Sequence, residues 1–468
     1  MKSLLSLEEI IAAVSPEIRG GAPKRFSSVG VDSRTVQAGG LFVALVGENT
    51  DGHRFVADAF DHGAAGALVS AGRLGAVSQE TEERPGRDDR GPSECLLIVS
   101  DSDQALLDLG RRAIAHQTGM TRIGITGSNG KTTTKEMVGA ILALNGSTFL
   151  TPGNYNSTIG IPLSVMPLES SYSYGVFEMA MNRRGEMARL AEMVKPEWAL
   201  ITNIGTAHIG HVGSQQAIAE EKIEIAGQFD GSQSCLIPKN DGYAEFLARR
   251  VRGRVIFYGE GATRELESVS LEGLGGARIR WRGRDIHIKL PGRHNVHNAL
   301  GALALAQELD IEPGIVVDGL ESVRPLFGRG ELIPGPVTLL QDCYNANPES
   351  VNAALELVAE AGWPGRVVLV LGPMKELGAD APASHAGVLQ SAISFGPAAA
   401  FLYGEEYEES YLSICRSGDG QGCFWTDSFD ELRDRVVRFV APGDLVVIKG
   451  SRAAALERIG EAIRKVGE

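Results

Sequence analysis

A chain of 468 residues with 43% hydrophobic and 22% charged residues is too long for a single core, which indicates a globular protein of about three domains. Its formal net charge of -14 at pH 7 argues against a nucleic-acid surface, and no apolar run approaches the ~20 residues that cross a bilayer. The five cysteines show no CxxC spacing, so we expect reduced thiols in a cytoplasmic protein, with neither a disulfide framework nor a zinc site.

The first predicted domain covers residues 1–102 and contains short helices and strands. Acidic residues interrupt the apolar positions of 1–11, which argues against a signal peptide and predicts an amphipathic helix. Strands are predicted at 40–47 and 64–70. The charged run 79–93 contains proline and glycine and is typical of a surface loop.

The second predicted domain covers residues 103–327 and alternates strands with helices. Nearly continuous apolar strands are predicted at 121–126, 174–180 and 198–204, a pattern typical of a parallel sheet with helices on both faces. Alternation with a period of two predicts a half-exposed hairpin at 277–290.

The third predicted domain covers residues 328–468 and repeats the alternation of strand and helix. This spacing favours a second doubly wound sheet. Its strands are predicted at 337–341, 366–371, 398–403 and 444–449, and its helices include 350–361 and 453–466.

A glycine-rich loop, Thr-Gly-Ser-Asn-Gly-Lys-Thr-Thr-Thr at 126–134, joins the first strand of the second domain to a helix. Such a loop directs backbone N–H groups and the positive end of a helix dipole at bound phosphates. Lys131 would add charge for the outer phosphates, and the Thr132 hydroxyl could hold Mg²⁺. Ile125 replaces the first glycine of the usual pattern, so an ordinary glycine-rich turn is the alternative. We predict a site for a nucleoside triphosphate.

Two other strand ends of the same predicted sheet carry polar residues, Glu178 and His208. Ligand-contacting residues gather beyond the carboxyl ends of parallel strands, so both could lie beside Lys131 and Thr132. Magnesium prefers oxygen ligands, which makes Glu178 the expected direct ligand and a histidine an unusual one. The alternatives are a solvated acid at a strand end and a loop histidine.

Two predicted helices carry further candidates. Lys222 is flanked by glutamates in a helix opened by Ser214, and its spacing alone favours an exposed lysine. Asn295 and Asn298 stand at the start of an apolar helix, where capping accounts for one of them. Two amides and two histidines in five residues exceed what a cap requires.

These features together resemble the ATP-dependent Mur ligases, which build the peptide stem of the bacterial cell-wall precursor. In the second domain the similarity lies in the glycine-rich loop, the stretch 153–162, Glu178, His208, Lys222 and the run H-N-V-H-N-A-L. In the third domain it lies in Asp342–Pro348, similar to the D-x-Y-N-A-N-P signature of the branch that adds D-alanyl-D-alanine, and in 372–378 with His385 and 447–452. In the first domain it lies in 31–34 and 41–47 with Asp51, Gly52, His53 and Phe55.

The resemblance implies a three-domain α/β fold. A small N-terminal α/β domain would hold the UDP-sugar, a central P-loop-type domain with a mostly parallel sheet would bind ATP, and a C-terminal Rossmann-like doubly wound domain would bind the incoming dipeptide and close on ATP. The substrates would be UDP-N-acetylmuramoyl-tripeptide and D-alanyl-D-alanine, joined through an acyl phosphate. ATP and Mg²⁺ would be the cofactors, and the enzyme would be a cytoplasmic monomer.

The resemblance also implies residue roles. The catalytic residues would be Lys131, Lys222 and His208, with Lys222 a lysine that some members carry as a carbamate. Magnesium would be held by Thr132, Glu178, His208 and Lys222. The nucleotide would contact Gly127, Ser128, Asn129, Gly130, Lys131, Thr132, Thr133, Asn295, Asn298, Arg329 and Asp342. The other substrates would contact Asp32, Ser33, Arg34, Gly47, Asp51, His53, Asn154, Tyr344, Asn345 and Asn347.

Two alternatives belong beside this hypothesis. A sister ligase would add a single amino acid such as diaminopimelate or lysine, but it should carry another sequence in place of Y-N-A-N-P. Sister ligases also have a lysine where this chain has Tyr344. A non-catalytic nucleotide-binding regulatory protein is the second alternative, and the presence of Lys131, Glu178, His208 and Lys222 argues against it.

Overall fold

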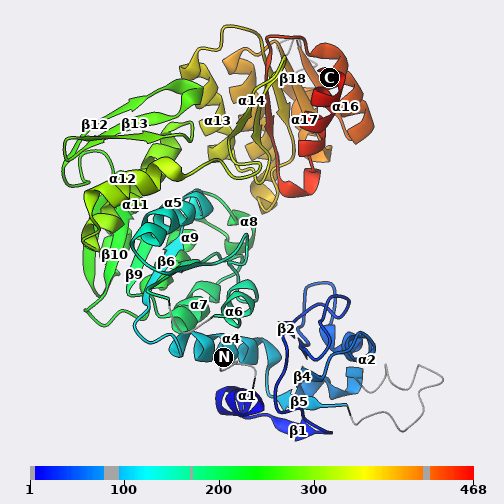
Figure 1. The fold of residues 1–468 in the computed structure, drawn as a ribbon. Helices are drawn as coiled ribbons and strands as arrows, with labels where there is room; N and C mark the ends of the chain where they lie inside the picture. The colour runs from blue at the N-terminus through cyan, green and yellow to red at the C-terminus, as the bar shows by residue number, and fades with distance from the viewer. Residues whose placement is uncertain (1–5, 78–93, 169–171, 415–421, 468) are drawn as a thin grey trace. The chain divides into compact units, whose positions relative to one another are not determined.

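The computed structural model describes residues 6–77, 94–168, 172–414 and 422–467 (Figure 1). The charged run 79–93, predicted as a surface loop, lies outside them. Contacts divide the chain into two compact units, one of residues 1–124, 147–181 and 185–197 and the other of residues 125–146, 182–184 and 198–468. The domain boundaries after residues 102 and 327 stay predictions.

The N-terminal sheet of the first unit has the strand order β1-β5-β4-β3-β2, with β1 antiparallel and the other pairs parallel. Leu41, Val43 and Leu68 pack on one face, while Phe42 and Ala67 pack on the other, so the sheet is buried on both sides. Its strands are β1 Glu17–Arg19, β2 Val29–Gly30, β3 Leu41–Val43, β4 Gly66–Ser70 and β5 Leu96–Val99, and its helices are α1 Leu7–Val14, η1 Gly52–Phe55, α2 Val56–Asp61 and η2 Ala71–Arg73.

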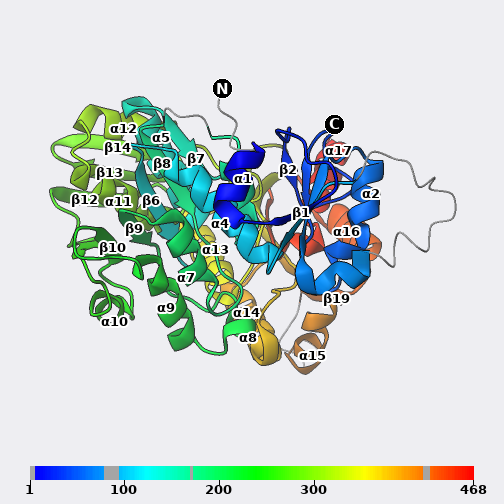
Figure 2. The ribbon, with the colours of Figure 1, turned by 90° about the horizontal axis from the view of Figure 1, so that it is seen from below.

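Helix α4, Ser102–Ala115, follows this sheet and is capped by Asp101, whose carboxylate accepts from the N–H groups of Asp103 and Gln104. It packs against α1 and against two helices that lie later in the chain (Figure 2). These are α6 Gly160–Val165 and α7 Glu186–Val194.

A six-stranded sheet has the order β11-β10-β9-β6-β8-β7. The pairs β7–β8, β9–β10 and β10–β11 are parallel, as predicted. Strands β8 and β9 end at Glu178 and Ile201, earlier than the predicted ranges. The strands are β6 Thr121–Thr126, β7 Thr148–Leu150, β8 Tyr174–Glu178, β9 Trp198–Ile201, β10 Ser234–Pro238 and β11 Arg254–Tyr258.

In the second unit, α5 packs against α11 and α12 (Figure 1). The predicted hairpin is confirmed as two strands of a three-stranded antiparallel sheet, in which Ala277, Ile279 and Trp281 are buried and the arginines between them are exposed. The elements are α5 Lys131–Asn145, α8 Ile209–Val212, α9 Gln215–Ile223, η3 Glu224–Ala226, α10 Ala244–Ala248, β12 Leu266–Leu271, η4 Gly273–Gly275, β13 Ala277–Trp281, β14 Arg284–Ile288, α11 Arg293–Glu308 and α12 Pro313–Ser322.

The last sheet has the order β15-β16-β20-β17-β18-β19 and is parallel except for β15. Separate apolar clusters lie on its two faces, which confirms the predicted doubly wound arrangement. Its strands are β15 Glu331–Ile333, β16 Thr338–Asp342, β17 Val367–Leu371, β18 Ala399–Tyr403, β19 Cys423–Thr426 and β20 Leu445–Lys449. Its helices are α13 Pro348–Ala361, η5 Gly378–Asp380, α14 Ala381–Phe395, η6 Glu405–Tyr407, α15 Glu408–Ser410, α16 Phe429–Phe439, η8 Arg452–Ala454 and α17 Glu457–Gly467.

The final helix begins later than predicted, at Glu457 instead of residue 453. Arg452–Ala454 form a 3-10 turn, and Ala455 has a φ of 48°, a left-handed conformation that cannot continue an α-helix. No helix in the described ranges has the length and apolar character that crossing a membrane requires. Cys95, Cys235, Cys343 and Cys423 are free thiols, as expected, and Cys415 lies outside the described residues.

Candidate functional site

The glycine-rich loop between β6 and α5 adopts a backbone that two of its glycines make possible. Gly127 has a φ of 150° and Gly130 a φ of 80°, values that residues with a side chain rarely adopt. A Cβ atom at Gly127 would overlap the Thr202 hydroxyl, and one at Gly130 would overlap the Asn298 amide. The loop therefore requires glycine at both positions.

Hydrogen bonds fasten this loop to the segment that follows β9. The N–H groups of Ser128 and Asn129 donate to the backbone oxygen (3.0 Å) and the side-chain oxygen (2.9 Å) of Asn203. The Gly205 N–H donates to the Ser128 hydroxyl at 2.8 Å, and the Thr202 hydroxyl donates to the Asn129 carbonyl at 2.6 Å. No side chain among the described residues caps α5, so its positive N-terminal end suits an anion.

Two lysines converge on one carbonyl of the loop. Lys131 Nζ donates to the Gly127 carbonyl at 2.7 Å and to the Ser128 carbonyl at 3.1 Å. Lys222 Nζ donates to the same Gly127 carbonyl at 3.0 Å. The Lys131 ammonium group thus lies beside the loop, where its charge would attract a triphosphate.

Lys222 is 1% exposed, so the exposed lysine favoured by its spacing is wrong. Ser214 does open helix α9, but Lys222 lies among its buried positions 217–219 and 221–223, while Gln216 and Glu220 form its exposed side. Burial lowers the pKa of Lys222 well below its usual range, and the nearby charge of Lys131 lowers this pKa further.

Two of the four predicted magnesium ligands, Thr132 and Glu178, have the oxygen atoms that Mg²⁺ prefers. Thr132 is buried in the first turn of α5 in the second unit. Glu178 ends β8 in the first unit and is 1% exposed, so the solvated acid is wrong. Its carboxylate accepts a hydrogen bond from the Asn156 amide at 2.7 Å.

No group of three or more His, Cys, Asp or Glu that could hold a metal occurs in the described part of the chain. This fits a Mg²⁺ held by a carboxylate and a hydroxyl together with substrate phosphates, because Mg²⁺ is rarely enclosed by protein ligands alone. The assignment of the metal to Thr132, Glu178, His208 and Lys222 stays a prediction.

His208 follows β9 and has a φ of 67°. Its Nδ1 lies 2.6 Å from Oε2 of Glu376, a residue of the loop after β17. Burial lowers the pKa of His208, which favours a neutral imidazole beside the carboxylate. Nearby, the N–H and hydroxyl of Thr206 donate to the two carboxylate oxygens of Glu349 at 2.8 and 2.9 Å.

Asn295 and Asn298 lie inside α11, and neither caps it, so the capping interpretation is wrong. The helix begins after Gly292, whose φ of 96° makes the turn without a side-chain cap. Asn298 donates to the Asn295 side-chain oxygen at 3.2 Å, and Asn295 donates to the Pro291 carbonyl at 2.8 Å. Both amides are buried, and Asn298 packs on Gly130 of the phosphate loop.

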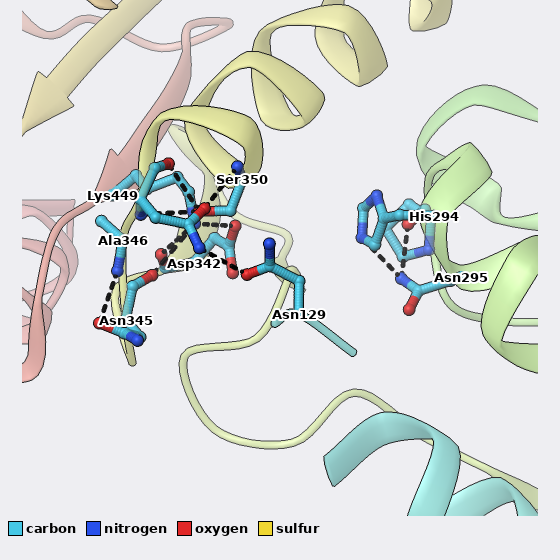
Figure 3. Close-up of polar contacts among 10 residues, drawn as sticks. Asn129, His294, Asn295, Asp342, Asn345, Ala346, Ser350 and Lys449 are labelled. Atoms are coloured by element: carbon cyan, nitrogen blue, oxygen red, sulfur yellow. Dashed lines mark hydrogen bonds and ion pairs between the residues drawn. The ribbon is translucent and has the colours of Figure 1, made fainter. Parts of the chain in front are cut away.

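The D-x-Y-N-A-N-P signature lies between β16 and α13. Lys449 Nζ, which is buried, contacts the Asp342 carboxylate at 2.6 Å and the Asn345 carbonyl at 3.2 Å. Asn347 caps α13 and donates from Nδ2 to the side-chain oxygen of Asn129 at 2.8 Å. Figure 3 shows Asn129 beside this group, with His294 and Asn295 on the opposite side of the view.

Arg329 and Tyr344, both predicted to contact ligands, lie near each other at the signature. The guanidinium of Arg329 lies 4.0 Å from the ring centre of Tyr344, a cation–π contact. The Tyr344 N–H donates to the Gly328 carbonyl at 2.9 Å, which holds the two segments together. The Asn345 side chain accepts from the Ala346 N–H.

The predicted sugar-binding residues lie in the first unit and form two local clusters. Asp32 and Arg34 pair at 2.7 Å, and this contact lowers the pKa of Asp32 to about 2. Asp51 accepts from both the backbone N–H and Nδ1 of His53, while the Ser70 N–H donates to Nε2. His53 is fully buried with both ring nitrogens bonded, so here it orders the domain.

The other residues predicted in that unit differ in exposure. Ser33 is buried, and Gly47 and Asn154 are exposed in turns. The Gly47 N–H donates to the Thr50 carbonyl at 2.8 Å. Their contacts with a substrate stay predictions.

The sequence interpretation missed three residues that shape the site: Asn203, Glu349 and Glu376. Glu376 stood in a quoted family motif, but without a role. Asn203 and Glu349 act through contacts with the phosphate loop and with Thr206. Spacing gives no signal for them, because their partners lie far away in the chain.

Family models match three parts of the chain: the Mur ligase family, catalytic domain at 25–91, the Mur ligase middle domain at 125–306, and the Mur ligase, glutamate ligase domain at 328–452. The chain is 38% identical over 466 residues to the UDP-N-acetylmuramoyl-tripeptide--D-alanyl-D-alanine ligase of Treponema pallidum. This alignment covers 99% of both chains.

Solved structures are also similar to this chain. MurF from Acinetobacter baumannii has a TM-score of 0.86 at 26% identity, covering 98% of this chain and 99% of that one. MurF ligase from Thermotoga maritima in complex with ADP has a TM-score of 0.76 at 26% identity, covering 94% and 97%. These similarities confirm the resemblance and the predicted α/β fold class, and the chain belongs to the Mur ligase family.

Proposed function

We propose that this chain is an ATP-dependent, ADP-forming ligase that joins D-alanyl-D-alanine to the tripeptide carboxylate of UDP-N-acetylmuramoyl-tripeptide. The relative from Treponema pallidum carries this activity in its name and aligns over 99% of this chain. The observation that carries the proposal is the 2.8 Å hydrogen bond between Asn347 and Asn129. It joins the signature of the dipeptide-adding branch to the phosphate loop.

The chemistry follows from the charges around that loop. A carboxylate is a poor electrophile, so the substrate carboxylate first takes the terminal phosphoryl group of ATP, giving an acyl phosphate and ADP. Lys131 and the N-terminal end of α5 stabilise the negative charge on the phosphoryl oxygens during transfer. Mg²⁺ would supply further neutralisation of phosphate charge, and the Thr132 hydroxyl at the start of α5 would be one of its ligands.

The second step forms the amide. The free amine of D-alanyl-D-alanine attacks the acyl carbon, inorganic phosphate leaves, and the nitrogen loses a proton. Water would hydrolyse the acyl phosphate, which is a reason to enclose it. The contacts of Thr206 with Glu349 and of His208 with Glu376 bring residues after β17 and at the start of α13 against the phosphate-loop side of the second unit.

We also propose that Asn295, Asn298, Arg329 and Asp342 contact the nucleotide. In support, Asn298 packs on the phosphate loop, and Asn347, which follows Asp342 after the end of β16, contacts Asn129 of that loop. We further propose that Tyr344, Asn345 and Asn347 contact the dipeptide, and that the enzyme acts in the cytoplasm as a monomer.

One assay tests the reaction. Purified protein with ATP and Mg²⁺ is given UDP-N-acetylmuramoyl-tripeptide with either diaminopimelate or lysine as third residue, and phosphate release is followed. D-alanyl-D-alanine should trigger release together with formation of the pentapeptide product. Release triggered by a single amino acid on a shorter substrate would instead identify a sister ligase, and nucleotide binding without turnover would identify a regulatory protein.

A further inference from the structure

Two segments far apart in the chain dock on each other within the second unit. One contains His208 and Gly210, after β9, and the other contains Glu376 and Gly378, after β17. Besides the 2.6 Å contact of Nδ1 with the carboxylate, the Gly210 N–H donates to the Glu376 carbonyl at 3.0 Å. Gly210 and Gly378 meet so closely that a Cβ atom on either would overlap the other's backbone. Glu376 is therefore held against His208 by backbone as well as by side chain.

We propose that Glu376 is a positioning residue for His208: its carboxylate fixes the imidazole with the proton on Nδ1 and leaves Nε2 as the atom available to a ligand. A neutral imidazole carries one proton, and the nitrogen that donates to a carboxylate is the one that keeps it. Partners of this kind orient a metal-ligating histidine and raise its basicity. The inference deepens the proposed function, on which it rests, because it assigns a role within the same site.

The backbone of both residues supports a specific role. His208 and Glu376 each have a φ of 67°, a left-handed conformation that is unfavourable for a residue other than glycine. Such conformations persist where the surrounding structure fixes them and are frequent at functional sites. Here the two residues lie on opposite sides of one 2.6 Å contact.

The loop that carries Glu376 is itself anchored inside its own sheet. The Met374 N–H donates to Nε2 of the fully buried His385 at 3.0 Å. The Lys375 N–H donates to the Ser451 hydroxyl at 3.1 Å, and the Lys375 side chain pairs with Glu406. These bonds hold the two residues before Glu376, so its carboxylate is presented from a fixed backbone.

The pair also faces the phosphate loop. His208 belongs to the segment after β9 in which Asn203 and Gly205 hydrogen-bond to Asn129 and Ser128 of the phosphate loop. The carboxylate thus fixes a ring that stands beside the groups proposed to receive the triphosphate.

The first test reads the tautomer directly in protein without nucleotide or metal. Protein labelled with ¹⁵N-histidine is measured by NMR at pH 8, and His208 is assigned by its loss in His208→Gln. The parent should show a protonated Nδ1 and a bare Nε2. Glu376→Ala should shift the proton to Nε2, which free imidazole side chains prefer, whereas Glu376→Gln should keep it on Nδ1, because its amide oxygen can still accept.

The matched control is Glu406→Gln, which removes the neighbouring carboxylate that pairs with Lys375 in the same loop. It should leave the His208 tautomer unchanged. A parent His208 protonated on Nε2, or a Glu376→Ala protein that keeps the proton on Nδ1, overturns the inference.

A second measurement links the tautomer to the site. The Mg²⁺ concentration for half-maximal phosphate release should rise about 10-fold or more in Glu376→Ala and stay near the parent value in Glu376→Gln and Glu406→Gln. An unchanged Mg²⁺ dependence in Glu376→Ala overturns the inference. If the parent ligates no tripeptide, the proposed function fails, and the tautomer measurement still decides the role of Glu376.

Discussion

Asn347, the cap of α13, donates a hydrogen bond of 2.8 Å to the side chain of Asn129 in the phosphate loop. One residue therefore both caps a helix and contacts the phosphate loop. Its side-chain oxygen accepts from the Ser350 N–H, while its Nδ2 reaches the loop. Helix stability and the nucleotide site are therefore coupled at a single amide. The two functions can be separated by substitution.

Asn347→Ser keeps a capping hydroxyl but is too short to reach Asn129. We expect its unfolding midpoint to remain near the parent value while the KM for ATP rises several-fold, since one hydrogen bond contributes about 1 kcal/mol. Asn347→Ala should lose the cap as well, at a cost of about 1 kcal/mol. Thermal unfolding and initial rates at varied ATP check this. Equal ATP dependence in the parent and both variants would show that the contact has no role in binding.

Lys131→Ala tests the phosphate loop. Its ammonium group contacts the Gly127 and Ser128 carbonyls, and the proposed function gives it the charge on the transferred phosphoryl group. We expect the ligation rate to fall by about a hundredfold to a thousandfold, as for other groups that stabilise transition-state charge. Circular dichroism should show an unchanged fold. Ligation near the parent rate would exclude the assigned role of the loop.

The loop, its flanking strand and helix, and the doubly wound last sheet could be predicted from sequence, because glycine spacing and apolar periodicity are local signals. The burial of Lys222 could not, since its glutamate neighbours suggest a solvent-facing position, whereas Gln216 and Glu220 form the exposed side of α9. The cap of α11 was also mispredicted, because Gly292 turns the chain by its φ instead of by a side chain.

The spacing of residues in the sequence could not predict contacts between distant segments. Glu376 and His208, or Glu349 and Thr206, meet only because two sheets bring strand ends together. The resemblance to a family supplied residue roles, but it gave no partner for His208. Side-chain positions were needed for that.

Lys222→Met should separate stability from function. A buried lysine is costly because its charged form is desolvated, and the same burial lowers its pKa. Methionine fills a similar volume without charge, so we expect a higher unfolding temperature together with loss of ligation. Lys289→Met, at an exposed position, is the control and should change neither. A Lys222→Met protein that retains ligation would contradict the catalytic assignment.

His385 should make the stability of the last sheet dependent on pH. Burial lowers the pKa of His385, with Glu406 acting to raise this pKa and Lys375 acting to lower it, while the ring packs on Tyr407. The folded imidazole stays neutral, donating to the Ala381 carbonyl and accepting from the Met374 N–H.

As pH falls below about 6.5, the unfolded chain protonates first. The stability that His385 contributes is therefore complete above that pH and is lost as pH falls toward the folded pKa. The maximum slope is about 1.4 kcal/mol per pH unit. His385→Gln offers an oxygen to the Met374 N–H without titrating. The difference in unfolding temperature between parent and His385→Gln should therefore shrink or reverse from pH 7.5 to pH 5.5, and a difference independent of pH would show that His385 does not titrate between the two states.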